Sequence, residues 1–175
     1  PIREVGYDYV GISLDGIGAT HDYFRRRQGA FDEALRGIRL YRDAGIKVGM
    51  RMTLTQDNAH QLPAVLDLME REGVDKFYLS HLNYGGRGNR NRKDDAHHQM
   101  TRKAMELLFA TCWRDIEAGR PREFVTGNND ADGAFLLEWV RRHMPERAGN
   151  LQARLQDWGG NASGKHIANI DNLGE

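Results

Sequence analysis

Residues 9–16 read Tyr9-Val10-Gly11-Ile12-Ser13-Leu14-Asp15-Gly16, and this stretch decides the fold. Val10, Ile12 and Leu14 alternate with small or polar residues, as in a β-strand, and the Asp-Gly pair then ends the strand in a loop. In α/β folds, groups at the carboxyl ends of parallel strands contact ligands. Ser13 and Asp15 are therefore candidate site residues.

Two more strands follow at regular spacing. Apolar residues at helical spacing predict helices over 30–44 and 62–72, and the patterns at 47–55 and 76–81 predict strands. Either Asp57 or Asn58 is expected to cap the second of these helices. The order strand, helix, strand, helix, strand predicts right-handed βαβ units and a parallel sheet. The three strand ends, 13–16, 53–58 and 80–84, should meet at one edge.

The pattern changes beyond this edge. Residues 83–95 form a polar loop, and helices are expected over 99–118, 131–143 and 147–158, with Pro145 separating the last two. We interpret the polar segment 124–133 as the cap region of a helix, and residues 167–174 as a strand and a turn. Three strands cannot close a barrel, and parallel strands need cover on both faces. The sequence, which opens on Pro1, is therefore expected to be an internal piece of a longer protein.

Composition excludes several classes of function. The 25 basic and 25 acidic residues give zero net charge, which argues against nucleic-acid binding. We expect no membrane association, because no apolar run reaches the about 18 residues of a membrane span. A single cysteine, Cys112, excludes an internal disulfide and fits a cytoplasmic protein. One thiol is also too few for an iron–sulfur cluster, and the histidine spacing does not fit zinc, so no metal site is expected in this chain.

Two groups of basic residues are candidate anion-binding sites. Arg25 lies in a basic turn after the first strand and can grip a carboxylate or phosphate; the alternative is a solvated turn. A second group lies in the loop after the third strand and suits a ligand with several carboxylates, although Asp94 and Asp95 can balance it. Its members are Arg87, Arg90, Arg92 and Lys93. His81, at a strand end, is a candidate acid or base.

These segments resemble radical SAM enzymes. Residues 10–16, Thr20-His21-Asp22 with Arg25, and 29–31 resemble the fourth strand of that fold and its helix. Residues 53–55 with Asn58 resemble the fifth strand, and residues 77–84 the sixth. Four further segments are similar to the SPASM-type branch that acts in haem d1 biosynthesis: 83–89, 92–97, 124–133, and 159–164 leading to Ile170-Asp171. The resemblance spans essentially the whole chain.

The resemblance implies an α/β fold, the C-terminal half of a radical SAM partial TIM barrel. Residues 1–85 would form the second half of the (β/α)6 barrel, 86–158 a basic loop and mainly helical bridge, and 159–175 the start of a truncated SPASM-like extension. Such enzymes use S-adenosylmethionine and a [4Fe-4S] cluster to generate a 5′-deoxyadenosyl radical. In haem d1 biosynthesis, this radical chemistry replaces propionate side chains of a didecarboxylated sirohaem by oxo groups, with electrons from a donor protein. The cluster-binding CxxxCxxC motif is absent here, so the cysteines would lie outside this chain, and the chain alone is expected to be inactive.

The resemblance also implies roles for individual residues. Ser13 and Arg25 would bind the carboxylate of S-adenosylmethionine, and Asp15, Asn58, Ser80 and Leu82 complete the expected cofactor-binding set. The basic loop from Arg87 to Lys93 would bind the carboxylates of the modified sirohaem. Three alternatives stay open: a related haem decarboxylase, a peptide-modifying SPASM maturase, and a tetrapyrrole-binding fragment without catalytic activity.

Overall fold

The structure is a computed structural model that describes residues 6–84, 92–120, 122–127 and 129–160. It contains these elements in chain order: β1 (Tyr9–Ser13), α2 (Ala19–Arg25), α3 (Ala30–Asp43), β2 (Lys47–Thr53), the 3-10 helix η1 (Ala59–Gln61), α4 (Leu62–Arg71), β3 (Lys76–Ser80), the 3-10 helix η2 (Arg92–Asp94), α6 (His98–Glu117), β4 (Glu123–Gly127), α7 (Ala131–His143) and α8 (Pro145–Trp158). The expected helices and the first three strands are confirmed, with ends that differ by a few residues at most. The strand expected over 167–174 lies outside the described residues.

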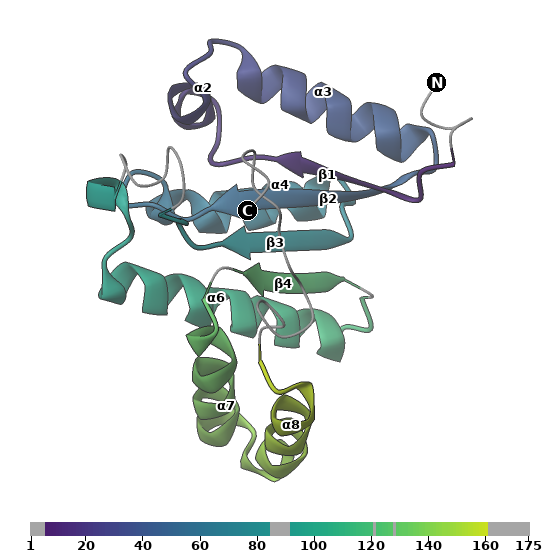
Figure 1. The fold of residues 1–175 in the computed structure, drawn as a ribbon. Helices are drawn as coiled ribbons and strands as arrows, with labels where there is room; N and C mark the ends of the chain where they lie inside the picture. The colour runs from purple at the N-terminus through teal and green to yellow at the C-terminus, as the bar shows by residue number, and fades with distance from the viewer. Residues whose placement is uncertain (1–5, 85–91, 121, 128, 161–175) are drawn as a thin grey trace, which may run out of the picture. The chain divides into compact units, whose positions relative to one another are not determined.

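The four described strands form one parallel sheet in the order β1-β2-β3-β4 (Figure 1). Each strand pairs with the next one along the chain, and at least one helix connects each pair. Parallel neighbours need such crossovers, because a short turn cannot bring the chain back to the start of the sheet. The fold is α/β, consistent with part of an α/β barrel.

The fourth strand corrects the interpretation of residues 124–133 as a helix cap. Residues 123–127 pair with β3 from Lys76↔Glu123 to Ser80↔Gly127. The run Phe124-Val125-Thr126 has strand propensity, but it is short and the polar residues after it resemble a cap. Asp130, which precedes α7, makes no side-chain cap hydrogen bond.

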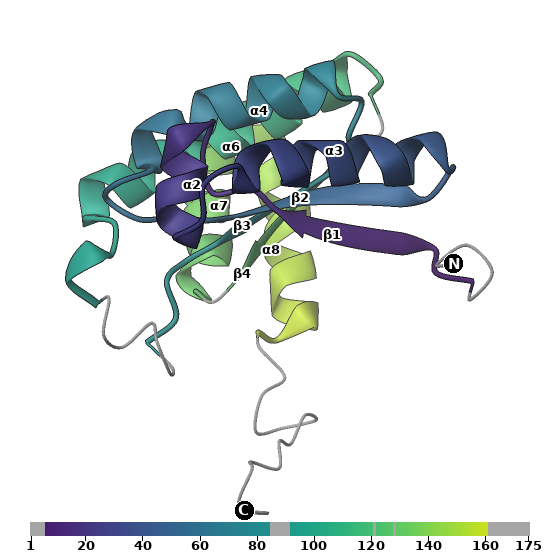
Figure 2. The same cartoon turned by 90° about the horizontal axis from the view of Figure 1, so that it is seen from above.

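One face of the sheet packs against α3, α4 and α6 (Figure 2). Met50, Met52, Leu54, Phe77 and Leu79 are fully or almost fully buried at this face. Alternate residues point to the other face and are more exposed, among them Tyr9, Gly11, Ser13, Arg51 and Tyr78. The sheet therefore has an apolar, helix-covered face and a second, polar face, which we call the open face.

The chain divides into two compact units, residues 1–129 and 130–175. In the second unit, α7 packs against α8. The ring of Trp139 stacks on His143 with centroids 4.4 Å apart. Pro145, expected to separate the two helices, is instead the first residue of α8, a position where the missing N–H of proline costs nothing. Within the described ranges, no helix has the length and apolar character needed to cross a membrane.

Candidate functional site at the carboxyl ends of the strands

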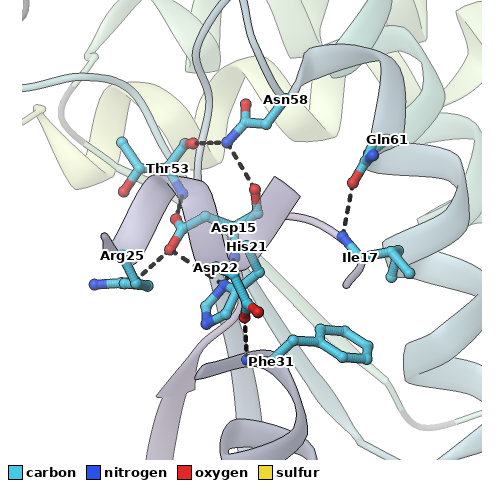
Figure 3. A network of polar contacts seen from close by, with 9 residues as sticks. All are labelled: Asp15, Ile17, His21, Asp22, Arg25, Phe31, Thr53, Asn58 and Gln61. Carbon is cyan, nitrogen blue, oxygen red and sulfur yellow. Dashed lines mark hydrogen bonds and ion pairs between the residues drawn. The ribbon is translucent and has the colours of Figure 1, made fainter. Parts of the chain in front are cut away.

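The site is built from the segments that follow β1 and β2. Asp15 comes after β1, Thr53 ends β2, and Asn58 precedes η1, so βαβ topology brings all three to the same edge of the sheet. Figure 3 shows their side chains and those of α2 pointing toward one another. The sequence prediction that these strand ends meet is confirmed for β1 and β2.

Asp15 connects three segments of the chain, and it is fully buried. Its Oδ1 accepts a hydrogen bond from the backbone N–H of Thr53 at 2.8 Å, and its Oδ2 pairs with the guanidinium of Arg25 on α2. Its own backbone N–H donates to His21 Nδ1 at 2.9 Å. The carboxylate thereby fixes the β1 loop, the end of β2 and helix α2 relative to one another.

Burial perturbs both titratable groups of this network. It raises the pKa of Asp15, and the Thr53 N–H and the Arg25 charge oppose this rise only in part. Burial also lowers the pKa of His21, despite the neighbouring Asp15 carboxylate. A neutral imidazole fits the geometry, because Nδ1 must keep its lone pair to accept the Asp15 N–H.

Asn58 uses its amide to bind backbone groups of both loops. Its Oδ1 accepts from the Thr55 N–H at 2.8 Å, and its Nδ2 donates to the carbonyl oxygens of Asp15 at 3.0 Å and Thr53 at 2.8 Å. The residue has no exposed surface. Asn58 therefore determines the backbone path of the site, and the side-chain cap expected at this position is absent.

Helix α2 is held at its start and at its middle. Gln61 accepts the Ile17 N–H at 2.6 Å and donates to Thr20 Oγ1 at 2.7 Å, which binds the start of the helix to η1. Asp22 accepts the N–H groups of Gly29 at 2.7 Å and Phe31 at 2.8 Å. These two hydrogen bonds lower the pKa of Asp22 and cap the start of α3. Arg25 consequently projects from a helix with a fixed position.

A pocket of about 610 Å³ opens beside this network. It is lined by Ala19, Asp22, Tyr23, Phe24, Arg26, Gln28, Thr55, Asp57, Leu82 and Asp94. Thr55 is 5% exposed, and its Oγ1 has no hydrogen-bond partner among the described residues. A buried hydroxyl without a partner is unfavourable, so a polar ligand that bonds to Thr55 would be stabilised here.

The structure brings some of the expected site residues together. Asp15, Arg25 and Asn58 belong to the hydrogen-bonded network, and Leu82 lines the pocket. Ser13 is exposed at the end of β1, and Ser80 is partly exposed at the end of β3. The backbone N–H of His81 donates to the carbonyl of Gly127 at 3.1 Å, which aligns the ends of β3 and β4.

The basic loop is described only in part, since Arg87 and Arg90 lie outside the described residues. The guanidinium of Arg92 lies 4.5 Å from the ring centroid of Tyr84, and the Tyr84 hydroxyl donates to Asp95. The Gln56 N–H donates to the Asp94 carbonyl at 3.0 Å, so η2 contacts the loop that follows β2. Between the described residues, Asp94 and Asp95 form no ion pair with Arg92 or Lys93.

A metal ion or an iron–sulfur cluster needs a different set of side chains from an organic ligand. Among the residues that the structure describes, no group of three or more His, Cys, Asp or Glu side chains could hold a metal ion. Burial raises the pKa of the Cys112 thiol, which disfavours the thiolate that binds iron. The described residues therefore do not fit a [4Fe-4S] cluster, whereas the pocket and the Thr55 hydroxyl fit a polar organic ligand.

Sequence reasoning missed three residues of this region. Gln61 and Thr55 carry no distinctive spacing, and their roles depend on contacts between segments far apart in the sequence. Arg51 could have been noticed, because a charged residue between the apolar residues of the strand Lys47–Thr53 is unusual for a parallel strand, which is expected to be covered on both faces.

The fold and the site together define an α/β protein with a buried polar network and a pocket at the carboxyl edge of a parallel sheet. No family model matches the chain. The chain is 53% identical to pre-heme d1 synthase of Dinoroseobacter shibae over 99% of its own length and 44% of that relative. It is 40% identical to Fe-coproporphyrin III synthase of Methanosarcina barkeri, over 93% of the chain and 41% of the relative. The AdoMet-dependent heme synthase of Nitratidesulfovibrio vulgaris is 40% identical over 45% of the chain and 22% of its own length.

These relatives confirm the resemblance to the radical SAM proteins of haem d1 biosynthesis. The chain spans less than half the length of the curated relatives it matches.

Proposed function

We propose that this chain is part of a radical SAM enzyme of haem d1 biosynthesis, and that it forms the last strands of that enzyme's barrel. The observation that carries the proposal is the 53% identity to pre-heme d1 synthase over 99% of the chain. The buried network around Asp15 supports it, because this network fixes the carboxyl edge of the sheet, where α/β proteins bind ligands.

The residues of this chain would hold S-adenosylmethionine rather than the cluster. Ser13 and Arg25 bind its carboxylate, Ser80 and Leu82 lie beside its adenine, and Asp15 and Asn58 position the loops. Arg25 already pairs with Asp15, so it reaches the carboxylate only with the donors that Asp15 leaves available. When bound, S-adenosylmethionine and a [4Fe-4S] cluster held by cysteines elsewhere supply the radical chemistry, with electrons from a donor protein.

The substrate of this proposal is a didecarboxylated sirohaem whose propionate side chains are replaced by oxo groups. Arg92 and Lys93, with Arg87 and Arg90, bind its carboxylates. The described part of this loop agrees with that role, because Arg92 is oriented by the Tyr84 ring and pairs with neither Asp94 nor Asp95.

The test is to incubate the full-length protein with S-adenosylmethionine, a reductant and didecarboxylated sirohaem, and to measure the product mass. Loss of propionate side chains supports the proposal. A second candidate is Fe-coproporphyrin III synthesis, which the 40% identity over 93% of the chain favours. A product that retains every propionate would support that candidate, and an unchanged substrate would contradict both.

A further inference from the structure

Arg51 lies in the middle of β2 on the open face of the sheet, and its side chain is exposed. In the register of the sheet, Arg51 lies beside Ser13 on β1 and Tyr78 on β3. Side chains in register on adjacent strands project from the same face and are close neighbours. Arg51 is thus located between a hydroxyl and an aromatic ring.

Two contacts restrict the orientation of the Arg51 side chain. Its guanidinium carbon lies 4.6 Å from the ring centroid of Tyr78. Its Cδ lies over Gly11, where an added Cβ would come within 3.1 Å. The glycine and the ring thus position the stem and the guanidinium of Arg51, and no described side chain occupies its N–H donors, which stay available for an anion.

Among the described residues Arg51 has no acidic partner, whereas five arginines of α2, α3 and the segment before β4 do. Arg25 pairs with Asp15, Arg39 and Arg42 pair with Glu72, and Arg120 and Arg122 pair with Asp115. No ion pair or hydrogen bond joins the Arg51 or Ser13 side chain to any residue in the described part of the chain. A planar guanidinium that is already oriented loses little entropy when it binds a carboxylate through two hydrogen bonds.

We propose that Arg51, with Ser13 beside it, binds a ligand carboxylate on the open face of the sheet. This inference rests on the proposed function, which offers two sources of that carboxylate: the methionyl group of S-adenosylmethionine and a side chain of the tetrapyrrole. Arg51 is a more available donor than Arg25, whose guanidinium neutralises the buried Asp15.

The experiment compares Arg51→Lys and Arg51→Gln with wild type in the full-length, cluster-loaded protein. Affinity is measured by calorimetry for S-adenosylmethionine and decarboxylated S-adenosylmethionine, and by absorbance titration for didecarboxylated sirohaem and its methyl ester. We expect one carboxylate ligand to bind about 10- to 100-fold more weakly to Arg51→Gln, the range of a lost charge-assisted hydrogen bond. The matching probe without a free carboxylate should bind wild type and Arg51→Gln equally. The ligand whose two probes differ in this way is the source of the carboxylate that Arg51 binds.

Three variants separate binding from folding. Arg51→Lys retains the charge and should lose most of the affinity, because an ammonium cannot form the paired contact. Tyr78→Leu removes the ring and should weaken binding about two- to fivefold. Arg36→Lys, on α3, is the control and should change nothing. If wild type binds both ligands and every Arg51 variant binds them equally well, the assignment of Arg51 is overturned and the proposed function stands. If wild type binds neither ligand, the proposed function fails.

Discussion

At the scale of single residues, the buried carboxylate of Asp15 has three structural roles. Asp15 accepts the Thr53 N–H, neutralises Arg25 and holds the loop after β1. A buried charge is tolerated only when it is paired and hydrogen-bonded, and removal of one partner leaves the others without compensation.

We therefore predict that Asp15→Ala lowers the free energy of unfolding by about 1–3 kcal/mol, since it leaves the Thr53 N–H unsatisfied. Asp15→Asn keeps an oxygen for Thr53 and should cost less. Denaturant unfolding measures both changes. Equal costs for the two variants would contradict the role of the Thr53 hydrogen bond.

His21 predicts a pH dependence of stability. Its folded-state pKa is lowered from 6.5 by burial, so the unfolded chain binds the proton more readily. The contribution of His21 to the free energy of unfolding is complete above pH 6.5 and is lost as the pH falls below that value. The raised pKa of Asp15 acts in the opposite sense. As the pH rises above 3.8, ionisation of this buried carboxyl lowers the free energy of unfolding.

The substitution His21→Asn tests this dependence, because its side-chain oxygen can accept the Asp15 N–H but does not titrate near neutral pH. We expect the wild-type free energy of unfolding to fall as the pH drops below 6.5, and the fall to be smaller in His21→Asn. Unfolding curves at a series of pH values measure it. Parallel pH profiles would assign the effect to other groups.

At the scale of elements, the sequence predicted what hydrophobic periodicity determines and missed what depends on contacts between segments. The helices and the first three strands follow from apolar spacing. β4 was missed because five residues give a weak sequence signal for a strand. Its pairing with β3, which one sequence does not reveal, is what establishes the strand. Asn58 was expected in the site from the sequence, but its three hydrogen bonds to backbone groups could not be derived from one sequence.

The contact between β3 and β4 gives a prediction for Gly127. A Cβ at this position would lie 1.9 Å from the Tyr78 hydroxyl oxygen and 2.7 Å from the ring carbon that bears it. Gly127→Ala should therefore displace the Tyr78 ring and lower the free energy of unfolding by about 1–3 kcal/mol. In a Tyr78→Leu background, the same substitution should cost much less. A double-mutant cycle measured by denaturant unfolding tests this, and additive effects would show that the ring is not the cause.

At the scale of the whole molecule, the chain has a sheet edge that we propose binds a ligand, but a single thiol. We predict that Cys112→Ser leaves the iron and sulfide content of the full-length protein unchanged, because Cys112 is half-buried and its raised pKa disfavours the thiolate. Iron and sulfide analysis after anaerobic reconstitution measures this. A variant with less iron would make Cys112 a cluster ligand.

The charge distribution of the molecule gives the last prediction. The chain has zero net charge, so under the proposed function the long-range attraction of a polyanionic tetrapyrrole comes from local groups of basic residues. Arg92 and Lys93 are exposed and, within the described residues, have no acidic partner. The double substitution Arg92→Ala, Lys93→Ala should raise the dissociation constant of didecarboxylated sirohaem at low ionic strength and have a smaller effect in about 1 M salt, where screening is nearly complete.

Arg36→Ala with Arg71→Ala, on α3 and α4, changes the net charge equally and is the control for a global effect. If both double variants weaken binding to the same extent, net charge rather than this loop attracts the substrate; if only the loop variant does, the loop binds its carboxylates directly.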